Sequence, residues 1–82
     1  MTDQTLTFGQ KAVGLRFNPS GDSHVEDVKQ LYAHVIDKMN ALRNTAQANG
    51  EHEKARLASI AITEAQGAQM WAVKAITWES ET

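Results

Sequence analysis

The stretch His52–Trp78, HEKARLASIAITEAQGAQMWAVKAITW, decides the predicted fold of this 82-residue chain. Its alanines recur at alternating steps of three and four residues, which keeps them on one stripe of an α-helix. The stripe comprises Ala58, Ala61, Ala65, Ala68, Ala72 and Ala75. A helix of this length is about 40 Å long. Most of the remaining chain must therefore run alongside it to cover the stripe.

A second, heptad-like pattern over residues 24–46 predicts the partner helix. Its apolar residues are Val25, Val28, Tyr32, Val35, Met39 and Leu42, with Leu31 and Ile36 widening the seam. Ser23 and Glu26 have the spacing of a capping box at its start, and Asn49-Gly50 is a stop and turn signal. Two long helices with a short connection predict an antiparallel hairpin.

The segment before the hairpin alternates apolar and polar residues, which favours extended chain, either a short strand or an arm. The alternating apolar residues are Leu6, Phe8, Val13, Leu15 and Phe17. The first five residues are polar and are expected to fray. We therefore predict a single domain that consists of an N-terminal arm over residues 1–16, a helical hairpin over 17–78 and a tail over 79–82.

Composition narrows the possible functions. The formal net charge is −2, whereas general DNA or RNA binders carry a basic surplus. The chain has no cysteine, so it cannot form a disulfide or a thiolate metal site. It has no apolar run of membrane-spanning length and no signal-peptide pattern. We expect a soluble, intracellular protein without a cofactor or metal, and a chain this short is expected to gain stability by oligomerisation.

Signals for catalysis are weak. The sequence contains no Gly-rich phosphate loop of a known kind and no serine or cysteine nucleophile motif. Its carboxylates are spread along the predicted helices in the manner of a solvated face. His52 and Glu53 lack the second histidine of a helical zinc site. We therefore predict a binding protein rather than an enzyme.

The loop before the first long helix carries three candidate ligand contacts. Phe17 and Asn18 precede Pro19, which restricts the loop, so the ring could stack on a nucleobase and the amide could bond to its edge. Alternatively, Phe17 packs the loop onto the hairpin and Asn18 closes a turn. Lys29 lies near this loop and could meet a phosphate, or it could pair with a carboxylate such as Glu26.

The polar residues of the second helix are Arg56, Thr63, Gln66 and Lys74, of which the first three are candidate ligand contacts. Thr63 and Gln66 lie within one turn of each other in an apolar run, where they could face a ligand or form hydrogen bonds between the helices. Trp71 and Trp78, seven residues apart, fit an oligomer contact better than a stacking platform.

The chain also resembles a known family. The resemblance rests on Glu-Asp-Val-Lys at residues 26–29 and on a run from Ala58 to Thr77. That run contains Ile60-Ala61, Thr63-Glu64, Gln66, Met70 and Val73-Lys74-Ala75. These motifs, which cover roughly residues 17–77, resemble the phage helical-hairpin cyclic-nucleotide sponge family. Its members are anti-CBASS and anti-Thoeris proteins, which sequester the cyclic nucleotide signals of bacterial immunity without cleaving them.

The resemblance implies a homo-oligomer, often a hexamer, that holds ligands between protomers. One class of pocket takes cyclic dinucleotides, a separate class can take cyclic trinucleotides, and some relatives bind cyclic ADP-ribose isomers. Lys29 matches the lysine of the dinucleotide motif. Phe17 stands in place of its tyrosine, with a shorter interval between the two residues. Arg56 matches an arginine assigned to the trinucleotide-type pocket.

We therefore predict an all-α antiparallel hairpin whose homo-oligomer sequesters cyclic oligonucleotide signals in the cytoplasm of the infected bacterial host and blocks CBASS-type signalling. The predicted ligand-binding residues are Phe17, Asn18, Lys29, Arg56, Thr63 and Gln66. Polymeric DNA, polymeric RNA and membranes are not expected partners. Two alternatives remain: a sponge for the cyclic ADP-ribose isomers of Thoeris, and a small helical module that contacts another protein through its tryptophans.

Overall fold

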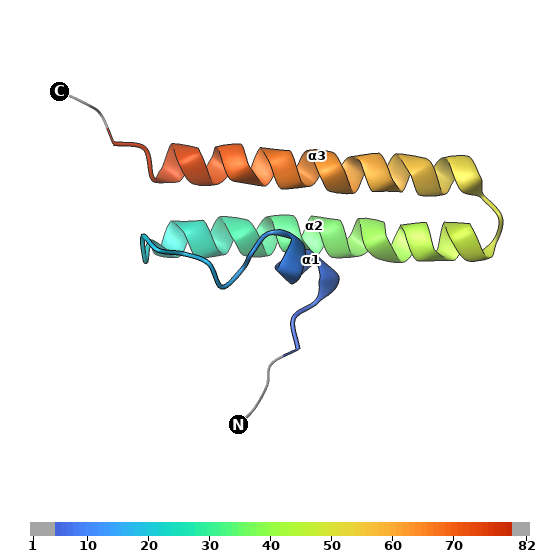
Figure 1. The fold of residues 1–82 in the computed structure, drawn as a ribbon, viewed down its shortest axis with the longest axis horizontal. Helices are drawn as coiled ribbons and strands as arrows, with labels where there is room; N and C mark the ends of the chain where they lie inside the picture. The colour runs from blue at the N-terminus through green and yellow to red at the C-terminus, as the bar shows by residue number, and fades with distance from the viewer. Residues whose placement is uncertain (1–4, 80–82) are drawn as a thin grey trace.

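The computed structural model describes residues 5–79, most of which lie in three helices. The helices are α1 (Phe8–Ala12), α2 (Ser23–Ala48) and α3 (His52–Ile76). α2 and α3 lie side by side in an antiparallel hairpin, with α1 packed near the middle of α2 (Figure 1). The predicted all-α hairpin is therefore confirmed. Residues 1–4 of the predicted arm and 80–82 of the predicted tail lie outside the described residues.

The residues that flank α2 determine where it begins and ends. Asp22 is the N-cap, and its Oδ1 accepts a 2.8 Å hydrogen bond from the backbone N–H of His24. The predicted capping box from Ser23 is wrong, because Ser23 is already helical and the aspartate before it caps equally well. At the other end, Gly50 has φ = +73°, a conformation that glycine adopts readily. The predicted turn at Asn49-Gly50 is confirmed.

The core lies in the middle of the hairpin. Its buried cluster comprises Val13, Ala33, Ile36 and Ile62. Ile36 of α2 is fully buried and belongs to the same cluster as Ile62 of α3 and Val13, which follows α1. Burial of an aliphatic side chain of this size contributes about 1.5–3 kcal/mol. The core therefore consists of residues from α2, from α3 and from the segment after α1.

In both long helices the buried residues differ in part from the predicted apolar seams. In α2 the innermost line runs through Lys29, Ala33 and Ile36, whereas Val35 and Leu42 of the predicted seam are exposed. The physical reason is that α1 and the loop after it cover the Ala33 side of α2. The alanine stripe of α3 is likewise only partly buried. Its members differ in burial: Ala58 is buried, Ala61, Ala65 and Ala72 are half-buried, and Ala68 and Ala75 are exposed.

The predicted extended arm contains a short helix instead. Thr7 and Gln10 form the capping box of α1: the Gln10 N–H donates to Thr7 Oγ1 and the Thr7 N–H donates to Gln10 Oε1. Asp37 of α2 then accepts from Thr7 Oγ1 at 2.7 Å and from the Gly9 N–H at 2.6 Å. These contacts outweigh the alternation of a few apolar residues, so the extended conformation predicted for this segment is wrong over residues 8–12.

The hairpin is one helix thick. Its shortest dimension is 12 Å, about the diameter of a single helix with its side chains. Several large apolar side chains therefore remain exposed, including Met70, Trp71 and Trp78, with exposed fractions of 66%, 72% and 65%. None of the helices within residues 5–79 is long and apolar enough to cross a membrane.

Substitution of Gly9 tests the close contact between α1 and α2. A Cβ atom at this position would lie 2.1 Å from the Ala33 carbonyl oxygen, so Gly9→Ala must displace α1 from α2. We expect a loss of about 1–3 kcal/mol in the free energy of unfolding, measured by urea denaturation. The matched control is Gly67→Ala, because no atom lies within 4 Å of a Cβ atom at that helical position. This control should gain about 0.5–1 kcal/mol. Equal stability of the two variants would contradict the close packing of α1.

Candidate ligand-binding site

The loop that leads into α2 is held in shape by its own side chains. Asn18 Nδ2 donates to the Asp22 carbonyl at 3.0 Å, and Asn18 Oδ1 accepts from Ser20 Oγ at 2.7 Å. The Asp22 N–H in turn donates to Ser20 Oγ, and Gly21 has φ = +69°. Asn18 therefore closes the turn, as one of the two sequence interpretations expected.

Lys29 fastens the preceding part of the loop to α2. Its side chain is buried, with 5% exposed, and its Nζ donates hydrogen bonds to the carbonyl oxygens of Gly14, at 2.9 Å, and Phe17. Loss of hydration lowers the pKa of the Lys29 ammonium group from its ordinary value. The alternative pairing with Glu26 does not occur among the described residues. Because an ammonium group has three donors, these two hydrogen bonds leave one donor for a further acceptor.

Phe17 presents an exposed ring beside this cation. Its side chain is 70% exposed, and Lys29 Nζ lies 5.6 Å from the ring centroid. The ring borders a cavity of about 230 Å³ between the loop and the end of α3. The cavity is lined by Phe17, Asn18, Pro19, Ser20, Val25, Lys29, Val73 and Thr77. An aromatic face and a partly desolvated cation thus lie at one opening, an arrangement that suits a base and a phosphate.

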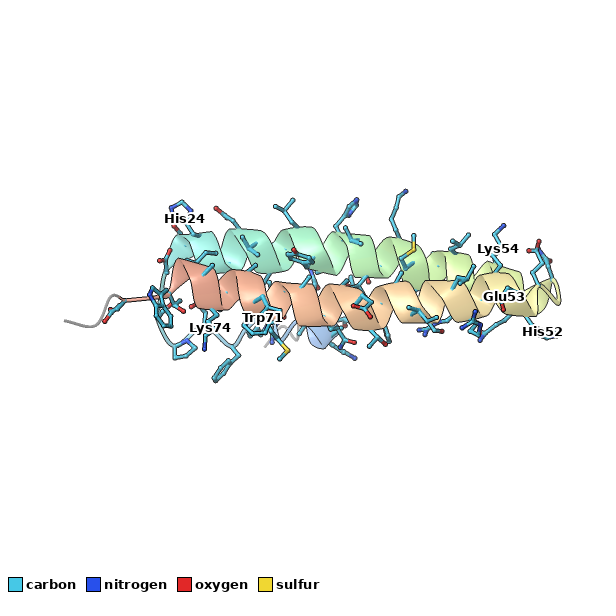
Figure 2. All side chains as sticks on the ribbon, turned by 90° about the horizontal axis from the view of Figure 1, so that it is seen from above. His24, His52, Glu53, Lys54, Trp71 and Lys74 are labelled. Atoms are coloured by element: carbon cyan, nitrogen blue, oxygen red, sulfur yellow. The ribbon has the colours of Figure 1, made fainter. Side chains whose placement is uncertain are left out.

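The end of α3 adds Lys74, Trp71 and Trp78, none of which the sequence analysis selected as a ligand-binding residue; it assigned the two tryptophans to an oligomer contact. Lys74 Nζ lies 5.8 Å from the centroid of the Trp78 ring, and a hollow of about 270 Å³ is lined by Trp71, Lys74, Ala75 and Trp78. Lys74 and Trp71 lie on the half of α3 that is next to the start of α2 (Figure 2). The i,i+4 spacing of Lys74 and Trp78 is the sequence signal that could have identified this pair.

Arg56 lies at the opposite end of the hairpin, near the turn between α2 and α3. It pairs with Glu53 through two hydrogen bonds, from Nε at 2.9 Å and from the guanidinium NH2 at 2.7 Å. The hydrogen bond from Arg56 lowers the pKa of the Glu53 carboxyl, and both side chains are exposed. Figure 2 shows Glu53 at the end away from Trp71 and Lys74. Arg56 is therefore remote from Phe17 and Lys29.

The other two predicted residues lie nearer the middle of α3. Gln66 is half-buried, and its Nε2 donates to the Ala12 carbonyl oxygen at 3.4 Å. This contact ties α3 to the end of α1. Thr63 is exposed, one turn earlier on the helix. The structure thus groups Phe17, Asn18 and Lys29 in one place, and it separates them from Thr63, Gln66 and Arg56.

Comparison with known proteins assigns the fold to a family. The model of the Acb2/Tad1 hairpin domain matches residues 10–77, from within α1 to the residue after α3. No curated protein and no solved structure gives a significant match. Because the family match covers most of the chain and the structure is the expected helical hairpin, this protein belongs to the Acb2/Tad1 hairpin-domain family, the family of anti-CBASS and anti-Thoeris sponges.

Proposed function

We propose that this chain, as a homo-oligomer, binds and sequesters cyclic oligonucleotide signals of bacterial immunity in the cytoplasm of the infected host, without cleaving them. The observation that carries the proposal is the exposed Phe17 ring beside the buried Lys29 ammonium group. The family of cyclic-nucleotide sponges to which the chain belongs supports the same ligand class.

The geometry suits a cyclic dinucleotide, which combines flat bases with two phosphates. Phe17 offers a stacking surface worth about 1–3 kcal/mol per base, and the remaining donor of Lys29 can bond to a phosphate oxygen. Asn18 contributes indirectly, because its hydrogen bonds fix the loop that carries the ring. Because these hydrogen bonds restrain the loop, less conformational entropy would be lost on binding.

The exposed apolar surface favours an oligomer. A hairpin one helix thick leaves Met70, Trp71 and Trp78 uncovered. Trp78 directly follows Thr77, which lines the Phe17 cavity. At a twofold axis, two copies of the chain would present two rings and two lysines. That arrangement matches the two bases and two phosphates of a cyclic dinucleotide. The two lysines would offset both phosphates even though the whole chain has a net charge of −2.

The surface at the other end of the hairpin is the proposed place for a cyclic trinucleotide. Arg56 is exposed there, and Thr63 lies two turns further along a similar face of α3. A trinucleotide carries three phosphates, and Arg56 would have to exchange its carboxylate partner Glu53 for one of them. Because this exposed ion pair is weak, the exchange is feasible.

The first prediction concerns the fate of the ligand. Purified protein should retain 3′,3′-linked cyclic dinucleotides with submicromolar affinity and release them unchanged after denaturation, as measured by titration calorimetry and mass spectrometry. The screen includes cyclic trinucleotides and cyclic ADP-ribose isomers as further ligands. Recovery of linearised nucleotide would show an enzyme and overturn the sponge assignment.

The second prediction concerns the ring and the cation. Phe17→Ala should weaken dinucleotide binding by about 1–3 kcal/mol through loss of stacking, without a change in thermal stability, because the side chain is mostly exposed. Phe8→Ala is the control, since that ring lies over Arg43 rather than Lys29. Lys29→Ala should weaken binding by about 2 kcal/mol. Unchanged affinity in both Phe17→Ala and Lys29→Ala, with the oligomer intact, would remove this site from the proposal.

The third prediction separates the two ends of the hairpin. Arg56→Ala should reduce trinucleotide affinity while dinucleotide affinity stays the same, because Arg56 is remote from the Phe17 cavity. Lys54→Ala, which removes a charge from the same end, should affect neither ligand. Equal losses for both ligands in Arg56→Ala would mean that a single site binds them.

The exposed tryptophans favour a second candidate, a protein-interaction module without a nucleotide ligand. Trp71 and Trp78 are each at least 65% exposed, and such rings are common in protein interfaces. Thermal unfolding distinguishes the two functions, because a ligand at one hundred times its dissociation constant adds about 2.7 kcal/mol to the folded state. If none of the cyclic nucleotides in the screen shifts the transition, the interaction module is favoured.

A further inference from the structure

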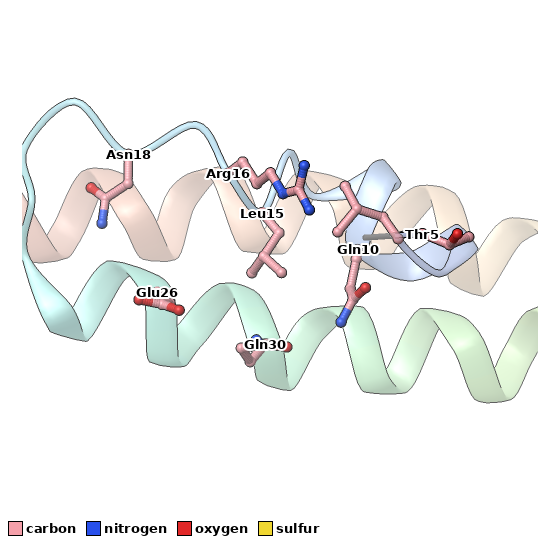
Figure 3. Close-up of a pocket in the computed structure, with 8 residues that line it drawn as sticks. Thr5, Gln10, Leu15, Arg16, Asn18, Glu26 and Gln30 are labelled. Carbon is pink, nitrogen blue, oxygen red and sulfur yellow. The ribbon is translucent and has the colours of Figure 1, made fainter. Parts of the chain in front are cut away.

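One face of the hairpin, called the arm face here, is covered by the N-terminal arm and the loop. The arm leaves a groove of about 640 Å³ beside Glu26 and Gln30 of α2 (Figure 3). The same face of α2 carries Ala33 and Asp37, which contact α1. On α3 the arm face carries Gln66, whose side chain bonds to the end of α1.

The side of the hairpin away from α1, called the far face here, has an apolar stripe on α2. Two positions along a helix turn a side chain by about 200°, so Leu31 and Val35, each two positions from Ala33, point away from α1. Lys38 and Leu42 follow at the spacing of seven that keeps residues on one stripe. All four side chains of the stripe are exposed. Apolar surface on this face therefore remains in contact with solvent.

α3 adds a stripe of mostly small residues to the far face. Glu64 and Ala68 each lie two positions from Gln66, so they also point away from α1. Residues at spacings of seven from these two extend the stripe: Leu57, Ala61 and Ala75. Small residues leave room for large side chains of a facing helix. The two stripes are therefore complementary in size, large on α2 and mainly small on α3.

Each stripe carries one charged residue, and the two charges lie at the same height along the hairpin. The antiparallel register is given by Arg43, whose NH1 donates to Ser59 Oγ at 3.1 Å. Lys38 lies five positions before Arg43, and Glu64 lies five positions after Ser59. Neither Lys38 nor Glu64 forms a hydrogen bond or an ion pair within residues 5–79. A cation and an anion thus lie level with each other, each within a mainly apolar stripe.

A twofold axis parallel to the long axis of the hairpin would bring the two stripes together. Rotation about such an axis keeps every residue at its height and places α2 of each copy over α3 of the other. Lys38 of each copy would then face Glu64 of the other, so the ion pair would form twice. Leu57 would face a hollow of about 400 Å³ at the height of Thr45, which is lined by Lys38, Met39, Ala41, Leu42 and Thr45.

The far face is also large enough for a stable contact. α3 has 25 residues and is about 37 Å long. Two neighbouring helices of this length, each about 10 Å wide, offer roughly 700 Å², and a stable interface buries about 800 Å² per partner. Because the stripes match each other in size, charge and height, a second copy of the chain fits this face.

We propose that the far face is a self-association surface, on which a second copy docks with its α3 over α2 and with Lys38 opposite Glu64. The contact is separate from the twofold axis proposed at the Phe17 cavity. That cavity is lined by Val73, which lies seven positions after Gln66 and so on the arm face. Two different twofold contacts on one chain produce an assembly of more than two copies. Only this last step rests on the proposed function.

Lys38→Glu tests the inference, with the mass of the assembly measured by analytical ultracentrifugation over a range of protein concentrations. The substitution places two carboxylates opposite each other at both copies of the contact, so the dissociation constant should rise about tenfold. Glu64→Lys should have the same effect. The double variant Lys38→Glu/Glu64→Lys should restore the wild-type mass, because it reverses the pair instead of removing it. Both side chains are exposed, so the variants should fold, and circular dichroism checks that they do.

Lys11→Glu is the matched control, because it makes the same charge change at an exposed lysine of α1, and its mass should equal that of the wild type. If the far face bound a different protein instead, the purified chain would not use it and neither single variant would change the mass. That result would overturn the inference, as would a wild-type chain that stays a single subunit at every concentration, or a loss that the double variant does not restore.

Titration calorimetry with a 3′,3′-linked cyclic dinucleotide keeps this inference distinct from the proposed function. The affinity of Lys38→Glu should match that of Lys11→Glu, because the Phe17 cavity lies on the arm face. A wild-type chain that assembles and responds to the charge reversals, yet binds none of the cyclic nucleotides, would support the self-association surface and contradict the sponge function.

Discussion

The buried ammonium group of Lys29 is the contact on which the candidate site depends. It joins α2 to the loop through the carbonyl oxygens of Gly14 and Phe17, and so it fixes where the Phe17 ring lies. The same contact has a cost, because the charged form loses hydration and its pKa falls. A phosphate that arrived beside Lys29 would offset part of this cost. An anionic ligand beside Lys29 would therefore gain more than it would beside a fully hydrated lysine.

The position of α1 links this site to the rest of the molecule. Asp37 holds the start of α1, and the Gly9 backbone fits against Ala33 where a side chain would clash. The chain then passes through the buried Val13 before it reaches the carbonyl groups that Lys29 binds. Docking of the arm therefore determines the path of the loop. Residues more than one helical turn away from the cavity contribute to its shape.

Local sequence signals predicted most of the fold. The long periodic runs predicted both helices of the hairpin, and Asn49-Gly50 predicted the turn, because each signal acts on its own segment. The predicted buried faces of the two long helices were less accurate. The face of α2 that is buried depends on where α1 packs, and the packing of α1 on α2 is a contact between segments distant in the sequence. α1 itself was missed, because five residues carry little periodicity and its stability comes from Asp37.

The candidate site shows the same limits. Proximity in sequence was enough to associate Lys29 with the Phe17 loop. The burial of Lys29 could not be predicted, because its hydrogen-bond acceptors are backbone carbonyls rather than acidic side chains. The groove beside Glu26 was missed because residues of the arm and of α2 come together there only in the folded chain. Lys74 was noted only as a polar residue of the second helix, although its i,i+4 spacing from Trp78 is a local signal.

The antiparallel pairing of α2 and α3 has an evolutionary consequence. A helix of 25 residues separates its two ends by about 37 Å, and substitutions so far apart have nearly additive effects on stability. Residues near the end of α3 can thus change while those near the turn between α2 and α3 stay constant. Residues near the turn can likewise change while those near the end of α3 stay constant. If the two ends hold separate sites, as proposed, one end of this scaffold could change its specificity without a loss of binding at the other.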